Sequence, residues 1–182
     1  QSAVWAALAL REQIGGDLSQ IEAVEIDTFE ACYSIIGSEP EKWEPKSRET
    51  ADHSLPYIVG VTLMDGKVDL SSFDEARYTD PNLLAFLKKI TVRHDPSMDA
   101  RYPEGIPNRI TLRLKDGRTL TEENTFPRGH ARNPMSDEEV EAKFYVLTEW
   151  ALPRERQDAV LQFLWSLDSQ ANLQPLMELL AV

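Results

Sequence analysis

Three short stretches of the chain alternate polar and apolar residues, which is the pattern of β-strands. They cover residues 21–29, 89–94 and 109–115, and side chains of a strand point alternately to its two faces. The third stretch is followed by Asp116-Gly117 and by a second run to residue 121. An Asp-Gly pair between two alternating runs is typical of a two-residue type I′ turn. The sequence therefore predicts a β-hairpin at about residues 109–121.

Other segments repeat apolar residues every three or four positions, as amphipathic helices do. Residues 2–14 form the first, which Gly15-Gly16 ends. A second begins near Ser54, because Pro56 is tolerated only in the first turn of a helix; Thr50 is the alternative N-cap. Short helices are predicted at residues 71–76 and 80–87, the second with Asp80 as N-cap, and a helix or turn at 31–36. Residues 37–48 and 95–107 are predicted loops, the first of them exposed.

The C-terminal part of the chain has the pattern of consecutive helices. Ser136 and Glu139 have the spacing of a capping box, which starts a helix predicted to end at about residue 150. Pro153 starts another, and apolar residues between 173 and 180 mark a last short one. The complete order of elements indicates an α+β fold with an antiparallel or mixed sheet covered by helices.

Length and charge limit the classes of function. The 182 residues suffice for one domain with a sizeable core. The net charge of −12 argues against nucleic acid and anionic membrane surfaces as partners. No apolar run approaches the roughly 20 residues of a membrane span. The apolar start lacks the basic region of a signal peptide, so we expect a cytoplasmic protein.

Metal and cluster cofactors are not expected. Cys32 is the single cysteine, and an iron–sulfur cluster normally needs several thiolates. His53, His94 and His130 lie far apart in the sequence, without the short spacing that is typical of metal sites. We therefore predict that the chain uses no cofactor.

Candidate chemistry is concentrated between residues 46 and 57. His53 lies at the predicted start of a helix, where the positive helix end disfavours a proton on imidazole. The sequence thus predicts a neutral His53 that acts as a base near pH 7. Arg48 can hold a carboxylate in a bidentate pair, and Asp52 can set the tautomer of His53 or only begin the helix. The alternative is a structural His53, as a cap or a buried hydrogen-bonded residue.

Further candidates lie in loops and on strands. The turn-rich loop around His130 offers cations for a carboxylate or phosphate, and Tyr102 offers a hydroxyl donor. His94 and Arg93, at the end of a predicted strand, are expected to be surface residues. The polar side of the hairpin is basic, and we expect a solvated sheet face there rather than a substrate face; its cations are Arg109, Arg113, Lys115 and Arg118.

Residues 48–57, Arg-Glu-Thr-Ala-Asp-His-Ser-Leu-Pro-Tyr, resemble the signature of the MmgE/PrpD family. The similarity extends through Asp65-Gly66 and Ile90-Thr91-Val92 into residues 134–144, and it covers roughly residues 20–150. The family includes 2-methylcitrate dehydratase, cis-aconitate decarboxylase and iminodisuccinate epimerase. The block Ala-Asp-His-Ser is its most specific part, and it does not say which of these reactions is run.

The resemblance implies a cofactor-independent hydro-lyase of propionate metabolism. Such an enzyme dehydrates a 2-methylcitrate-like tricarboxylic acid by removing a proton next to a carboxylate. The matching positions assign proton transfer to His53 and substrate binding to Arg48, with Lys46 as a fallback. The residue pattern adds three further substrate-binding candidates, namely Asp52, His130 and Tyr102. Decarboxylation of cis-aconitate, epimerisation of an iminodicarboxylate and a non-catalytic assembly domain are the alternatives.

The resemblance also implies that the chain is part of a longer protein. Residues 1–152 would be the second, α+β domain of the family. Residues 153–182 would be C-terminal helices that return to a preceding helical domain, so these helices should expose an apolar face. The expected partners are a small di- or tricarboxylate, that helical domain and a second copy in a homodimer. Because the family's other catalytic groups lie upstream, we expect the 182 residues alone to be inactive.

Overall fold

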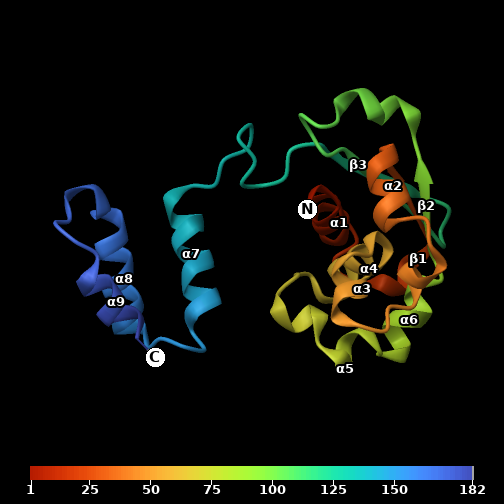
Figure 1. Ribbon diagram of the computed structural model, residues 1–182. Coiled ribbons are helices and arrows are strands. Elements are labelled where there is room, and N and C mark those ends of the chain that lie inside the picture. The colour runs from red at the N-terminus through yellow and green to blue at the C-terminus, as the bar shows by residue number, and fades with distance from the viewer. Residues whose placement is uncertain (182) are drawn as a thin grey trace. The chain divides into compact units, whose positions relative to one another are not determined.

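The computed structural model describes residues 1–181, and the first of its two compact units contains a four-stranded sheet with helices packed against it (Figure 1). The strands are β1 (Ile21–Thr28), β2 (Ile90–His94), β3 (Asn108–Leu114) and β4 (Thr119–Asn124), in the order β2-β1-β3-β4. β1 is parallel to β2 and antiparallel to β3, and β3 is antiparallel to β4. The sheet is therefore mixed, and the predicted α+β class is confirmed.

Helix α1 (Ser2–Gln13) packs on β3, β4 and helix α4 (Leu55–Asp65). The apolar face of the helix predicted at residues 2–14 points inward: Ala3, Ala6, Ala7 and Leu10 are all buried. Alanines allow the helix to approach closely, so the side chains of Ile110, Leu112 and Leu114 on β3 fill the core beneath it. The first unit thus has one continuous core between helices and sheet.

The connection from β1 to β2 contains most of the remaining helices of this unit. It passes through α2 (Glu30–Ile36), η2 (Pro40–Trp43), α3 (Arg48–Asp52), α4, η3 (Leu70–Phe73), α5 (Glu75–Tyr78) and α6 (Pro81–Leu87); η1 (Leu18–Gln20) precedes β1 and η4 (Pro96–Arg101) follows β2. The prediction that the loop at residues 37–48 is exposed is wrong at Lys42 and Trp43. Lys42 is 7% exposed, and the Trp43 indole N–H donates to the Ile90 carbonyl at 2.9 Å.

The hairpin turn differs from the predicted two-residue type. Leu114 N donates to the Arg118 carbonyl, and Gly117 N donates to the Leu114 carbonyl, so three residues form the loop. Gly117 has a φ of +88°, whereas no other residue type in the described chain has a positive φ. A type I′ turn needs positive φ at both central residues, including Asp116. A three-residue loop that places only the glycine in the left-handed region avoids that strain.

The basic side of the hairpin is neutralised by carboxylates. Arg109 contacts Asp95 at 3.1 Å and Glu123 at 3.0 Å. Glu25 on β1 accepts from Arg93 at 3.0 Å and from Arg113 at 3.1 Å. These pairs join all four strands, so this face is a lattice of alternating charges rather than a surface that attracts an anion.

The second compact unit spans Pro134–Val182 and consists of helices. They are α7 (Asp137–Thr148), α8 (Arg154–Trp165), η5 (Leu167–Ser169) and α9 (Gln174–Leu180), and the predicted capping box of Ser136 and Glu139 is present. A small core contains Leu152, Val160 and Leu176. The compact units divide between residues 133 and 134; the expected family boundary at 152/153 refers to the longer protein and stays a prediction.

Many apolar side chains of the second unit are exposed, as predicted for the last helices. They include Trp150, Leu164, Trp165, Leu173 and Met177. No helix within residues 1–181 is both long enough and apolar enough to cross a lipid bilayer.

Candidate functional site

The site predicted around His53 lies at a junction of two helices. Ser47 caps α3, because its hydroxyl accepts from Thr50 N at 3.1 Å, and α3 then ends at Asp52. Ser54 caps α4 by accepting from Tyr57 N at 3.1 Å, with Pro56 in the first turn. The predicted later helix start at Ser54 is confirmed. His53 therefore directly follows the last residue of α3 and directly precedes Ser54, the N-cap of α4.

The imidazole of His53 is exposed and is held by one of its two nitrogens. Nδ1 contacts the Asp52 carboxylate and lies 3.1 Å from the Glu49 carbonyl oxygen. Both partners are acceptors, so Nδ1 carries the proton and Nε2 is left for a ligand. The side chain is 63% exposed, which makes Nε2 accessible to solvent.

The hydrogen bonds of His53 favour the charged ring rather than the predicted neutral one. The hydrogen bond to Asp52 raises the pKa of His53 above its usual value, and the Glu49 carbonyl adds to the increase. The prediction placed His53 at the positive end of a helix. His53 does lie directly before the Ser54 cap of α4, but it also caps the C-terminal end of α3, where carbonyl oxygens and a carboxylate favour the imidazolium. His53 is thus suited to hold a proton as well as to accept one.

Arg48 and Lys46 are exposed near this junction. Neither side chain pairs with a carboxylate among residues 1–181, so both can bind an external anion. Lys46 lines a shallow hollow that also contains Glu41 and Glu44. Those carboxylates weaken the local field for an anion at Lys46, which leaves Arg48 as the better candidate.

Tyr102 and His130, the other predicted contacts, belong to different segments. Tyr102 follows η4 and stacks on Phe29, with ring centroids 4.7 Å apart. His130 lies in the loop after β4, with its ring 4.9 Å from that of Phe126. No hydrogen bond or ion pair in the described chain joins either residue to His53. Their place in substrate binding stays a prediction.

Two sets of contacts could not be read from the sequence, one at the junction of α3 and α4 and one at the end of β2. The buried Ser54 hydroxyl also donates to the Lys42 carbonyl at 2.5 Å, which ties η2 to the start of α4. His94, expected to be a surface residue, is 27% exposed and lies between two carboxylates, Asp99 at 3.0 Å and Glu30 at 3.3 Å. Both contacts join residues from separate elements. Within the described chain, no three His, Cys, Asp or Glu side chains are arranged to hold a metal ion.

Known proteins resemble this chain over most of its length. The 2-methylcitrate dehydratase of Escherichia coli (strain K12) is 32% identical over 171 residues, which are 89% of this chain and 35% of that protein. The 2-methylcitrate dehydratase of Salmonella typhimurium (strain LT2) is 36% identical over 140 residues, 72% of this chain and 28% of that protein. Cis-aconitate decarboxylase of Mus musculus is 31% identical over 140 residues, 75% and 28% respectively. The chain spans about a third of the length of these relatives.

A family model described as the MmgE/PrpD C-terminal domain matches residues 1–168. The match includes the Ala-Asp-His-Ser block and the junction of α3 and α4. The chain therefore belongs to the MmgE/PrpD family and carries its C-terminal domain.

Proposed function

We propose that this chain is the His53-bearing part of a lyase that acts on a small di- or tricarboxylate. The first candidate reaction is dehydration of a 2-methylcitrate-like acid, because relatives of 31–36% identity include 2-methylcitrate dehydratases. The observation that carries the proposal is the geometry of His53. Its Nδ1 is fixed by Asp52 while the ring stays exposed, and Arg48, five residues earlier in the chain, forms no ion pair among residues 1–181.

In the proposed reaction, Nε2 of His53 accepts the proton from the carbon next to a carboxylate. The C–H electron pair forms the new double bond and the neighbouring C–O bond breaks. The leaving hydroxide takes a proton from an acid group supplied by the preceding domain of the longer protein and departs as water. Asp52 stabilises the imidazolium, and Arg48, with Lys46 as the fallback, holds a substrate carboxylate. The raised pKa of His53 favours proton retention between these steps.

A second candidate is decarboxylation, which cis-aconitate decarboxylases among the relatives favour. Epimerisation on the same scaffold begins with a similar carbanion and stays an alternative. We further propose that the protein needs no cofactor and that it is a homodimer in the cytoplasm. A preceding helical domain would cover the exposed apolar residues of the last helices. It also includes inactivity of the 182 residues alone, because this chain supplies one part of the site.

The test uses the full-length parent protein with 2-methylcitrate and follows the absorbance of the conjugated double bond. We expect product from the parent and a loss of at least about a hundredfold in kcat/KM for His53→Ala, the lower range for a general acid–base group. His94→Ala is the matched control and should retain the rate. If the parent forms no product, the dehydratase assignment is wrong, and cis-aconitate is the next substrate to test. An unchanged rate in His53→Ala would remove His53 from the chemistry.

A further inference from the structure

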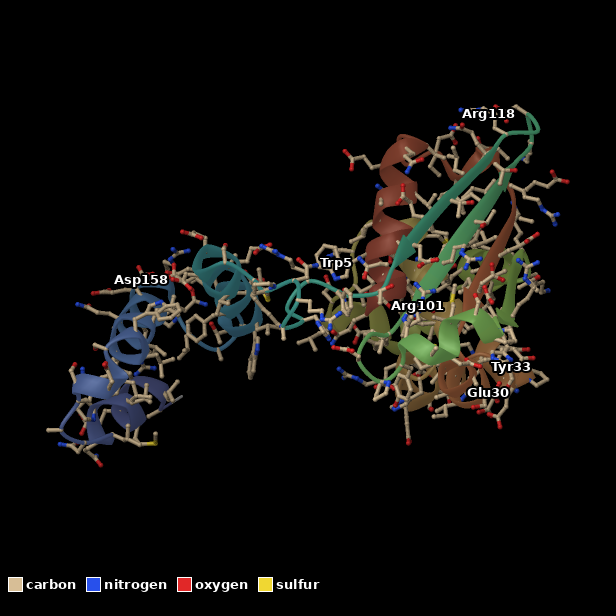
Figure 2. The ribbon with its side chains drawn as sticks, turned by 90° about the horizontal axis from the view of Figure 1, so that it is seen from above. Trp5, Glu30, Tyr33, Arg101, Arg118 and Asp158 are labelled. Atoms are coloured by element: carbon tan, nitrogen blue, oxygen red, sulfur yellow. The ribbon has the colours of Figure 1, made fainter. Side chains whose placement is uncertain are left out.

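A small hollow lies beside the end of η4 and the loop after β4, in the region where Figure 2 labels Arg101. Its lining residues are Ala100, Arg101, Glu104, Thr125, Phe126 and Arg132. The two segments are joined where Ile106 N donates to the Thr125 carbonyl at 3.0 Å. A Cβ at Gly105 would lie 2.4 Å from Thr125 Cγ2, so glycine permits this close approach. The hollow is thus built by tertiary packing and brings two guanidinium groups together.

The segment that forms the hollow is basic in an acidic protein. The arginines of the sheet face are paired with carboxylates of the sheet and its flanks. Outside the hairpin, residues 100–107 and 125–133 contain three arginines and one glutamate, a net charge of +2, whereas the whole chain has a net charge of −12. These cations lie at the end of η4 and in the loop after β4, so an anion is attracted to this region of the molecule.

Arg101 is held in place and keeps donors for a further acceptor. Its Nη1 donates to Glu123 at 2.5 Å and lies 3.3 Å from the Thr125 hydroxyl. A guanidinium has five N–H donors, and both contacts use the same nitrogen. Arg101 therefore offers a fixed, charged hydrogen-bond donor at the wall of the hollow.

Arg132 is held by interactions that an incoming anion can replace. It pairs with the Glu104 carboxylate and lies over the Phe126 ring at 5.1 Å. The Arg132 and Glu104 side chains are 56% and 70% exposed. An exposed pair of this kind contributes little to stability. Displacing Glu104 therefore costs little free energy, while the aromatic ring keeps the guanidinium above the hollow.

We propose that this hollow binds a small oxyanion, a carboxylate or a phosphate, between Arg132 and Arg101. The anion takes the position of the Glu104 carboxylate on Arg132 and accepts a further bond from Arg101. The His130 ring lies 4.9 Å from the Phe126 ring and accepts from Arg132 N at 3.1 Å, so its resonances report occupancy. This inference is independent of lyase chemistry at His53.

The test is a titration of the folded chain followed by histidine ring signals in ¹H–¹³C spectra. The chain has three histidines, and His→Gln variants assign them. Inorganic phosphate and citrate are added in separate titrations at constant ionic strength, which distinguishes the two anion types. We expect a saturable shift of the His130 signals with at least one of them, while the His94 signals stay in place.

Three variants make the result specific. Arg132→Gln should weaken the Kd at least tenfold, and Glu104→Gln should tighten it, because the competing carboxylate is gone. Arg118→Gln, which removes the same charge at the hairpin turn beside Asp116, should leave the Kd unchanged. A shift of His130 that does not saturate, or equal weakening by Arg118→Gln and Arg132→Gln, would overturn the proposal. A shift of the His53 signals would show that the anion binds at the proposed lyase site, and it would not test the hollow at Arg132.

Discussion

At the scale of single residues, the protonation of His53 depends on which atoms surround Nδ1. The Asp52 carboxylate and the Glu49 carbonyl both accept from this nitrogen, and both therefore stabilise the charged ring. The sequence indicated Asp52, the preceding residue, as a group that can set the tautomer of His53, but not the Glu49 carbonyl, a backbone oxygen one helix turn away. The same two contacts orient the ring and leave Nε2 exposed.

Asp52→Asn should lower the pKa of His53, because the first cause of its increase is the hydrogen bond to the Asp52 carboxylate. The sign follows from charge, since an amide does not favour the imidazolium as a carboxylate does. An NMR pH titration of the ring signals measures the change. Asp69→Asn, which removes a carboxylate paired with Lys67 instead, is the control. Identical His53 pKa values in the wild type and Asp52→Asn would show that the pair does not form in solution.

At the scale of elements, Ser54 fixes the start of α4 and its neighbour η2 together. One hydroxyl accepts from Tyr57 N and donates to the Lys42 carbonyl. The chain between these residues contains Lys46, Arg48 and His53, so this single buried contact sets how the candidate site is presented. Figure 1 shows α3 directly beside α4.

Ser54→Ala should lower the free energy of unfolding by about 2 kcal/mol, since it removes a helix cap and a buried hydrogen bond. Ser47→Ala removes only the exposed cap of the five-residue α3 and should cost about 1 kcal/mol or less. Urea unfolding of both variants measures the difference. Equal losses would mean that the bond to Lys42 contributes nothing.

At the scale of the whole molecule, the two compact units have separate cores. The core of the first unit contains buried residues from Ala3 to Leu114, and that of the second is formed around Leu152, Val160 and Leu176. No residue of the second unit belongs to the first core among the described residues. The first unit therefore contains all the apolar burial that its own fold requires.

A chain shortened to residues 1–133 should remain folded, because its core is complete. Residues 134–182 alone should unfold without cooperativity, since so small a unit buries too little apolar surface. Near-UV circular dichroism and urea unfolding of both pieces provide the measurement. Loss of the cooperative transition in residues 1–133 would show that the second unit is needed for the first to fold.

Sequence patterns determined the elements that depend on local chemistry. Alternation identified β1, β2 and the hairpin strands, and cap residues identified the starts of α4, α6 and α7. These predictions succeeded because a period of two or of three to four, and a cap at Ser54, Asp80 or Ser136, act within one element. The block around His53 also indicated the family, which the match over residues 1–168 confirms.

Only the tertiary structure decided which charges are available. The basic hairpin became a neutral lattice because the register places Glu25 and Glu123 beside its arginines. The pKa of His53 is raised because its ring is turned to the Asp52 carboxylate and the Glu49 carbonyl at the end of α3, although His53 also lies before the start of α4. Arg101 and Arg132 line one hollow because Gly105 allows two loops to touch. In the hairpin and the hollow the deciding partner lies on another strand or loop, and at His53 the orientation of the ring decides; a hydrophobic pattern within one segment carries no information about either.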